Sequence, residues 1–384
     1  MKYFILFLFP ILTFGANAQS YDSLIDRAEY AFQQKDWPAA LKIFHIALTD
    51  STREGKFDLY YGAMTAVHCD SPALALQWLM LAQQKGLGLG PGELASFQGD
   101  SSWSPLYRYA AWQRFMDAMT RAYGDQLAVQ QKAVAAWKAE TQSHRIPIGH
   151  GKTPVPAGFA LYYSQTDTIK VPYLVYVPTS SPRPAKVIVY LHGGVDSHAD
   201  FGDDDPQVRD EPIFAVADSL HALVIYPFAR KSFGWLHQRA AFTQVLQILH
   251  EAGEHYAIDP HQCYMVGMSN GGSACFWYAS QPQSPFRTFL AISALPELPV
   301  GGIEFSRIIP SHPLYSVNTT DDEVFPYKEV IKYYDAQKGV ATGWHFQTLP
   351  AGGHGFIYAA GGPSLLLHYV RDLMTAAESG GHDH

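Results

Sequence analysis

The feature that most constrains this chain is a glycine-rich turn centred on a serine, Gly-Met-Ser-Asn-Gly-Gly at residues 267–272. The turn follows an apolar run at residues 263–266 and precedes a helical pattern at residues 271–279. In such a strand–turn–helix setting the serine hydroxyl stands on a strained turn, where glycines avoid collisions with the neighbouring strand and helix. The start of the helix also stabilises developing negative charge. We therefore predict that Ser269 is a nucleophile; the alternative is a serine-containing turn in an inactive fold.

Short β-type runs alternate with helical stretches from about residue 160 onward. A run with a continuous apolar core, as in residues 186–191 after the initial lysine, is expected of a strand covered on both faces. The alternation predicts an α/β fold, a mainly parallel sheet with helices on both faces. The predicted strands are residues 160–163, 171–177, 186–191, 222–226, 263–266, 290–292, 314–317 and 345–349. The predicted helices are residues 240–257, 271–279, 326–334 and 363–374.

A His-Gly-Gly sequence at residues 192–194 comes directly after one of the apolar strands. A strand that ends in this way supplies the second wall of an oxyanion hole, because glycines let a backbone N–H group approach a substrate oxygen. We assign the two oxyanion donors to the backbone N–H groups of Gly194 and Asn270, with Val195 as the alternative to Gly194. His192 is expected to orient this loop rather than to take part in catalysis.

A serine nucleophile needs a general base, and the base needs an orienting acid. The expected chain order is serine, then acid, then histidine. The candidate base is His354, which follows the strand predicted at residues 345–349 and lies between glycines that let its ring swing over the turn. His368 falls within a predicted helix, and the remaining downstream candidates lie at the chain's end.

The orienting acid is expected just after the strand predicted at residues 314–317, where Asp321 and Asp322 are adjacent. The usual pattern has the acid two residues before a valine, here Val324, and this favours Asp322. Pro326 suits the first turn of the next helix. Asp321 remains the alternative, and the aspartate that is not the acid would be a solvated loop residue or a cap.

These motifs resemble a known family. The sequence Ile-Asp-Pro at residues 258–260, with Tyr-Met-Val-Gly-Met-Ser-Asn-Gly-Gly at residues 264–272, is similar to the polyhydroxybutyrate depolymerase and feruloyl esterase-like branch of the α/β-hydrolases. The resemblance covers residues 170–369 and implies the α/β-hydrolase fold and a Ser-His-Asp triad. The chain departs from that branch at Gly194, in its lack of evident disulfide-forming cysteines, and in its helical front region. The resemblance therefore implies no particular substrate.

The first eighteen residues have the layout of a cleavable secretory signal. Lys2 supplies a short positive region, residues 3–12 are almost entirely apolar, and Ala16-Asn17-Ala18 places small residues before the expected cut. The apolar run is too short to span a membrane comfortably. We expect a secreted or periplasmic protein, with an uncleaved anchor as the alternative.

The region from residue 19 to residue 145 reads as helical and contains an internal repeat with an offset of 35 positions (63 minus 28). The recurring residues are Ala28, Ala31, Ala40, Phe44 and Ala47, matched by Ala63, Ala66, Ala75, Leu79 and Ala82. This pattern resembles the tetratricopeptide repeat, in which small residues let paired helices pack closely. Two further helices are expected, near residues 112–116 and at residues 126–138. The region would be either a docking surface for a partner protein or substrate, or a packing module.

The chain thus divides into a signal peptide (1–18), a tetratricopeptide-like helical domain (19–145), a linker (146–160), an α/β-hydrolase catalytic domain (161–378) and a disordered tail (379–384). The formal net charge is -8 and no basic run is present, which argues against a nucleic-acid partner. The three cysteines are too few and too scattered to predict a disulfide framework.

For two loops the sequence leaves two interpretations open. The acidic loop Asp203–Asp205 could bind a cation, although such a run is more often a solvated loop. The loop at residues 228–235 carries Phe233 and Trp235, which either line an acyl or sugar pocket or anchor a long loop.

The predicted function is a secreted carboxylic-ester hydrolase that forms an acyl-enzyme on Ser269 and needs no metal or organic cofactor. Its substrate is expected to be a small-molecule or polymer-linked ester. One alternative is a serine peptidase resembling the prolyl oligopeptidases, which share the triad order but usually carry a β-propeller. The other is a non-catalytic, repeat-based interaction protein, against which the complete triad argues.

Overall fold

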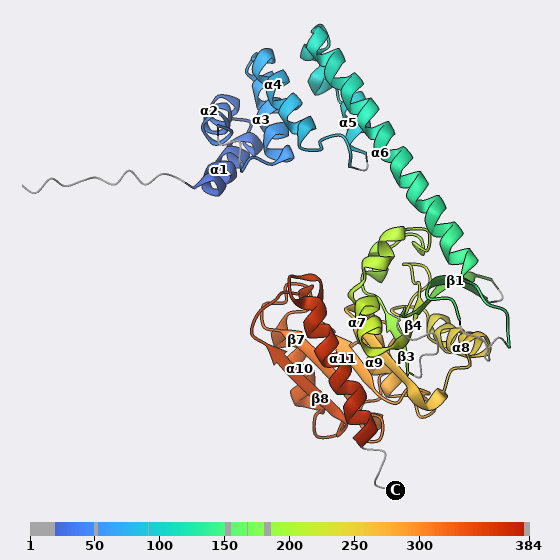
Figure 1. Cartoon of the computed structure of the whole chain (residues 1–384). Coiled ribbons are helices and arrows are strands. Elements are labelled where there is room, and N and C mark those ends of the chain that lie inside the picture. The colour runs from blue at the N-terminus through green and yellow to red at the C-terminus, as the bar shows by residue number, and fades with distance from the viewer. Residues whose placement is uncertain are drawn as a thin grey trace, which may run out of the picture. The chain divides into compact units, whose positions relative to one another are not determined.

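The computed structural model of the chain describes residues 20–49, 53–90, 92–149, 155–166, 168–179 and 186–379 (Figure 1). The described residues divide into two compact units between Lys132 and Ala133. The predicted signal peptide at residues 1–18 lies outside the described residues, as do residues 380–384 of the predicted tail. Within the described ranges, no helix is both long and apolar enough to cross a membrane.

The first unit is built from helices that pack in pairs, α1 against α2 and α3 against α4. The helices are α1 (Tyr21–Gln33), α2 (Trp37–Ala47), α3 (Lys56–His68), α4 (Pro72–Gln84), α5 (Glu93–Gly99) and the 3-10 helix η1 (Ser101–Leu106). The residues of the internal repeat lie in the apolar core between these helices, where alanines such as Ala28 and Ala63 are fully enclosed. The prediction of a helical front region is therefore confirmed, while its membership of the tetratricopeptide family stays a prediction.

The long helix α6 (Ala110–Ser143) is continuous, so the prediction of two separate helices near residues 112–116 and at 126–138 is wrong. The stretch between them contains no proline, and its one glycine, Gly124, costs a helix only about 1 kcal/mol relative to alanine. The end of α6 belongs to the second unit. There Trp137 is fully buried, with its ring centroid 5.2 Å from that of Phe159.

The second unit contains, among its described residues, an eight-stranded sheet with the order β1-β2-β4-β3-β5-β6-β7-β8. The strands are β1 (Gly158–Gln165), β2 (Lys170–Val177), β3 (Lys186–Leu191), β4 (Ala222–Pro227), β5 (Cys263–Met268), β6 (Phe289–Ile292), β7 (Leu314–Thr319) and β8 (Trp344–Leu349). β2 runs antiparallel to both β1 and β4, and from β4 to β8 all neighbours are parallel. This order, with its antiparallel edge, is that of the α/β-hydrolase fold, as predicted.

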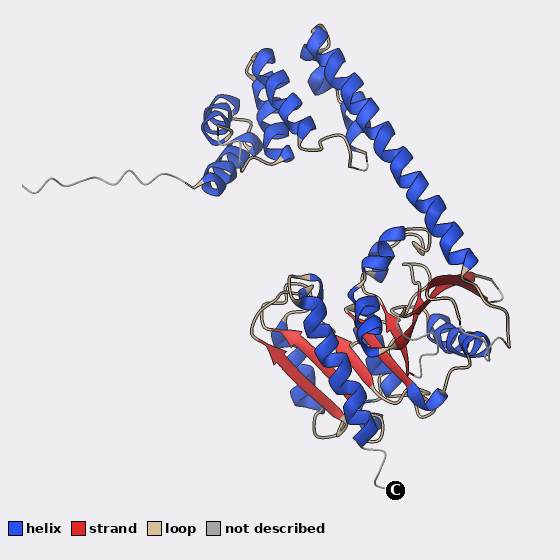
Figure 2. Ribbon diagram, viewed as in Figure 1, coloured by secondary structure: helices blue, strands red, loops and turns tan. Residues whose placement is uncertain are grey.

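Helices cover both faces of this sheet (Figure 2). They are α7 (Pro212–Leu220), α8 (Arg239–Tyr256), α9 (Asn270–Ala279), α10 (Tyr327–Gln337) and α11 (Gly362–Ser379). Along β3, Val187 and Val189 enter the core beneath α8 and α9, whereas Ile188 and Tyr190 enter the core beneath α7 and α11. Successive strand residues point to opposite faces, so both sets of side chains must be apolar.

The helix α7 was not predicted, because residues 200–212 before it are rich in aspartate and proline and read as loop. In the structure Pro212 occupies the first turn of α7, where its missing N–H costs nothing. Phe214 and Val216 then bury their side chains against the sheet. The parallel strands all end at the same edge, and the loops at that edge carry the predicted site residues.

Candidate active site

Ser269 lies between β5 and α9 on a turn whose backbone is held in an unusual conformation. Its φ and ψ are 55° and -119°, a region that non-glycine residues rarely adopt and that is typical of functional turns. A Cβ atom on Gly267 would overlap the backbone of Gly271, and one on Gly271 would overlap the backbone oxygen of Leu191. The glycines therefore let β5, α9 and β3 approach closely enough to force the serine into this conformation.

His354 follows β8 and meets Ser269 directly. Its Nε2 lies 2.8 Å from Ser269 Oγ, and the edge of its ring faces the ring of Phe325 at a centroid distance of 5.3 Å. The turn before it contains Gly352 and Gly353, with φ values of 137° and 64°. Glycine adopts such positive φ values without the steric cost of a side chain, and this lets the chain turn back toward the serine.

Asp322, which follows β7, is the aspartate that reaches His354. Its two carboxylate oxygens lie 3.0 and 2.9 Å from His354 Nδ1, and its side chain has 0% exposure. The backbone N–H groups of Val324 and Phe325 also donate to this carboxylate, at 2.9 and 2.8 Å. Because Nδ1 faces a carboxylate, the proton is assigned to Nδ1, and Nε2 is free to accept the proton of Ser269.

Asp321 is a cap, one of the two roles expected for the aspartate that is not the orienting acid. Its carboxylate accepts the backbone N–H groups of Gly352 and Gly353, at 3.1 and 2.9 Å. These two hydrogen bonds lower the pKa of Asp321 below its usual value. Asp321 thus caps the turn that carries His354, and the structure does not bring it to the ring itself.

His192 holds the loop that forms the opposite wall of the site. The backbone N–H of Ala229 donates to His192 Nε2 at 3.0 Å, so the ring proton is assigned to Nδ1, which donates to the carbonyl oxygen of Gly193 at 2.7 Å. Burial lowers the pKa of His192 to about 4, and the ring is therefore neutral at pH 7. In a trans peptide the N–H points opposite to the carbonyl, so this bond also fixes the direction of the Gly194 N–H.

The side chain of Asn270 connects the serine turn to the loop that follows β3. This contact was not predicted from the sequence. Its Oδ1 accepts the backbone N–H of Val195 at 3.0 Å. Because this hydrogen bond engages the backbone N–H of Val195, the backbone N–H of Gly194 is the favoured oxyanion donor of that loop. The backbone N–H of Asn270 belongs to the first turn of α9, where N–H groups have no partner within the helix. The only signal in the sequence was an amide residue directly after the serine.

The structure also shows the contacts of the two loops for which the sequence left two interpretations, the acidic loop Asp203–Asp205 and the aromatic loop at residues 228–235. In the acidic loop, Asp203 accepts a hydrogen bond from Tyr163 at 3.1 Å, Asp204 lies 3.5 Å from Lys138, and Asp205 caps the backbone N–H of Gln207 at 2.9 Å. Across the described ranges, no three histidine, cysteine, aspartate or glutamate side chains gather as a metal site would require.

In the aromatic loop, the side chains of Phe233 and Trp235 are 6% and 1% exposed and pack in the core. They anchor the loop, as one of the two interpretations proposed. Phe228, at the start of the same loop, instead lines a cavity beside His192.

Comparisons with known proteins show resemblance at the level of structure. No protein-family model and no curated protein sequence matches the chain. Among solved structures the chain is similar to a ferulic acid esterase, with 18% identity and a TM-score of 0.45 over 57% of this chain and 98% of that one. Est1E from Butyrivibrio proteoclasticus is 14% identical, with a TM-score of 0.42 over 57% of this chain and 99% of that one.

A third similar structure is the acylaminoacyl peptidase of Pyrococcus horikoshii, 13% identical with a TM-score of 0.43, matched over 56% of this chain and 42% of that one. The assignment to the α/β-hydrolase fold rests on the strand order and on the serine turn between β5 and α9.

Proposed function

We propose that this chain is a secreted serine hydrolase that cleaves carboxylic esters, with Ser269 as its nucleophile. The observation that carries the proposal is the hydrogen-bonded path from Ser269 Oγ through His354 to Asp322, which begins with a 2.8 Å contact. This path starts from a strained serine turn, so geometry and chain order support the same chemistry. The substrate would be a small-molecule or polymer-linked ester.

In the proposed reaction Ser269 Oγ attacks the ester carbonyl while His354 Nε2 takes the hydroxyl proton. Asp322 stabilises the imidazolium that forms, and the backbone N–H groups of Gly194 and Asn270 stabilise the oxyanion. His354 then gives the proton to the departing alcohol, which leaves an acyl group on Ser269. Water, activated by the same histidine, releases the acid. Every proton transfer uses side chains of this site, so the reaction requires no metal or organic cofactor.

Several features favour this function over its rivals. The three hydrogen-bonded side chains argue against a non-catalytic interaction protein, because each serves the same proton path. The helical front region differs from the β-propeller usual in prolyl oligopeptidases, which argues against a peptidase of that type. Secretion is proposed from residues 1–18, which have the layout of a cleavable signal. A protein partner for the helical region remains part of the proposal.

The proposal is tested by steady-state hydrolysis of 4-nitrophenyl esters and of prolyl amides. Ser269→Ala should lower kcat for the esters by at least about 10³-fold, the usual cost of removing a triad residue. Ser311→Ala, which alters an exposed serine, serves as the matched control and should leave kcat unchanged. Faster turnover of the prolyl amides would favour the peptidase alternative. Full ester hydrolysis by Ser269→Ala would contradict the proposal.

A further inference from the structure

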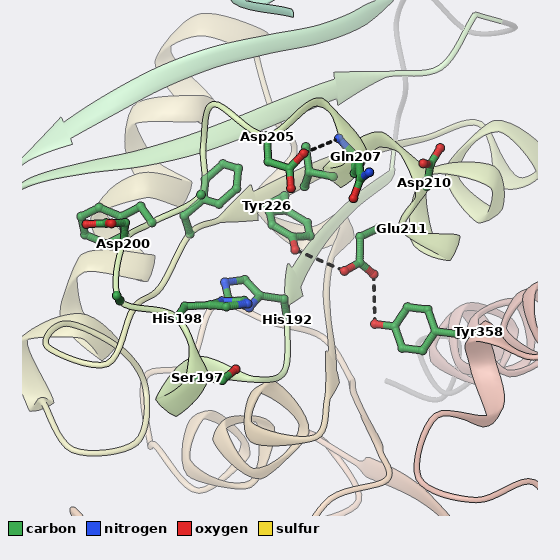
Figure 3. A pocket seen from close by; sticks show the side chains of 15 residues that line it. His192, Ser197, His198, Asp200, Asp205, Gln207, Asp210, Glu211, Tyr226 and Tyr358 are labelled. Carbon is green, nitrogen blue, oxygen red and sulfur yellow. Dashed lines mark hydrogen bonds between the residues drawn. The ribbon is translucent and has the colours of Figure 1, made fainter. Parts of the chain in front are cut away.

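A cavity of about 640 Å³ is lined by His192, the first residue of the His-Gly-Gly loop (Figure 3). Its volume is within the usual range of about 300–1,000 Å³ for small-molecule sites. Its walls come from the loop after β3, the turn before α7, the end of β4 and the turn after His354. Most of its polar lining consists of His192, His198, Asp200, Asp205, Asp210 and Glu211.

Glu211 is anchored in this cavity by two tyrosines, as Figure 3 shows. The hydroxyl of Tyr358 donates to one carboxylate oxygen at 3.1 Å, and that of Tyr226 lies 3.5 Å from the other. Burial raises the pKa of Glu211, and the two hydroxyls oppose that rise. The pKa of Glu211 is therefore set mainly by burial, and a nearby positive charge would stabilise its ionised form.

The other carboxyl groups of the cavity belong to residues that line it directly. Asp200 and Asp210 are exposed acids on its lining, and no lysine or arginine is found among the described residues that line it. The two neighbouring arginines are engaged: Arg209 pairs with Glu140 at 3.1 Å, and the Arg230 guanidinium lies over the ring of Phe201 at 4.6 Å. The cavity therefore attracts a cation and repels an anion.

Aromatic walls complete the cavity. Tyr226, Phe228 and Tyr358 contribute rings to it, and a fourth lining ring, that of Phe201, is already in contact with the Arg230 guanidinium. Aromatic faces attract cations through their electron density, and quaternary ammonium groups are often bound in this way. A carboxyl group among aromatic rings, whose ionised form a positive charge stabilises, thus suits an ammonium group better than it suits a neutral alkyl chain of the same shape.

The cavity is connected to the proposed chemistry through two of its residues. His192 lines it and also holds the carbonyl of Gly193, next to the oxyanion donor Gly194. Tyr358 lines it from η6 (Phe356–Tyr358), the turn that begins two residues after His354. A group bound in the cavity would therefore lie beside both loops that flank Ser269.

We propose that this cavity binds the cationic end of the substrate, an ammonium group held by Glu211 and the surrounding aromatic rings. The inference rests on the proposed function, because it assigns a substrate class to that same site. It predicts a preference for esters that carry an amine or quaternary ammonium group over neutral esters of equal shape.

The direct test is calorimetric binding of choline and of 3,3-dimethylbutan-1-ol, which have the same shape and differ in the ammonium charge. The wild-type protein should bind choline at least tenfold more tightly. Glu211→Gln keeps the size of the side chain but removes its charge, so it should reduce that ratio by about tenfold. Asp200→Asn, at an exposed position, should reduce the ratio by a smaller factor. Glu304→Gln, which removes an exposed acid outside the cavity, is the matched control.

Equal affinity for the two compounds in the wild-type protein would overturn the inference. A choline preference that is unchanged in both Glu211→Gln and Asp200→Asn would also overturn it, as would tighter binding of a neutral sugar such as glucose. Hydrolysis of 4-nitrophenyl acetate, measured on the same samples, reports on the proposed function separately. An inactive protein that still prefers choline would refute the ester hydrolase, while an active one without the preference would refute only the cationic substrate.

Discussion

The two sides of the proposed site are held in place by different means. On the serine side the backbone itself decides the geometry, because β3, β5 and α9 pack so closely that Gly267 and Gly271 leave no room for a Cβ atom. On the other side, the loops that carry His354 and Gly194 are held by side-chain hydrogen bonds, from Asp321 in one case and from His192 and Asn270 in the other. The serine turn should therefore tolerate no added atom, whereas the loops depend on individual hydrogen bonds that substitutions can weaken in steps.

The largest effect is expected at the acid. Asp322→Asn should lower kcat for ester hydrolysis by roughly 10⁴-fold, because an amide facing Nδ1 favours the wrong imidazole tautomer. The side chain keeps its size, so circular dichroism and the unfolding midpoint should show a folded protein. Steady-state kinetics on the purified variant measure the loss. A loss of less than tenfold would mean that the orienting acid lies elsewhere.

The next largest effect is expected on stability, at Gly271 on the serine side of the site. Gly271→Ala should destabilise the fold by about 3 kcal/mol or more, because its new Cβ would overlap the Leu191 backbone oxygen and either α9 or β3 must move. Gly253→Ala in α8 is the matched control, since a Cβ there would meet no atom within 4 Å. The control should be neutral or stabilising by about 0.5–1 kcal/mol. The free energy of unfolding of both variants is measured with urea. Equal values for Gly271→Ala and Gly253→Ala would contradict the proposed role of backbone packing.

The burial of His192, which holds the oxyanion loop, should make the free energy of unfolding depend on pH. The pKa of His192 is lowered to about 4 in the folded state, whereas it is about 6.5 in an unfolded chain. The unfolded chain therefore binds more protons between these values, so stability is lost as pH falls from about 6.5 toward 4. The expected loss is about 3 kcal/mol between pH 7 and pH 4. Urea unfolding should show a shallower pH dependence for His192→Gln than for wild type, and identical slopes would contradict a buried, neutral ring.

The smallest effect is expected at Asp321. Asp321→Asn should lower kcat less than tenfold, because an amide oxygen can still accept one of the two N–H groups of Gly352 and Gly353. Asp321→Ala removes both acceptors and should cost more than Asp321→Asn. Kinetics on the pair therefore sharpen the distinction between a capping aspartate and an orienting one. A loss at Asp321→Asn larger than that at Asp322→Asn would reverse the two assignments.

The sequence was sufficient to locate the residues that the structure brings into hydrogen-bond contact. Ser269, Asp322 and His354 each follow a predicted strand, in a loop that glycines or a proline mark clearly. Parallel strands end at one edge of the sheet, so their loops must meet there. The mainly parallel sheet could be predicted for the same reason, since strands covered on both faces are apolar throughout.

The sequence suggested that His192 orients its loop and left open that Asp321 is a cap, but the partners of these contacts could not be predicted, because they depend on loop conformations that leave no periodic pattern. The contact between Asn270 and Val195 joins residues 75 positions apart, and that between Asp321 and Gly353 joins residues 32 apart. Local patterns also misled in places. The acidic, proline-containing stretch before α7 read as loop throughout, and a weak hydrophobic pattern in α6 read as two helices.

The central claim, that Ser269 is an activated nucleophile, is tested most directly by mapping a fluorophosphonate adduct. The protein is treated with the reagent and digested, and the modified peptide is identified by mass spectrometry. We predict a single adduct on the peptide that contains Ser269, its absence in Ser269→Ala, and slower labelling in Asp322→Asn. An adduct on another residue, or a wild-type protein that stays unmodified while folded, would contradict the account.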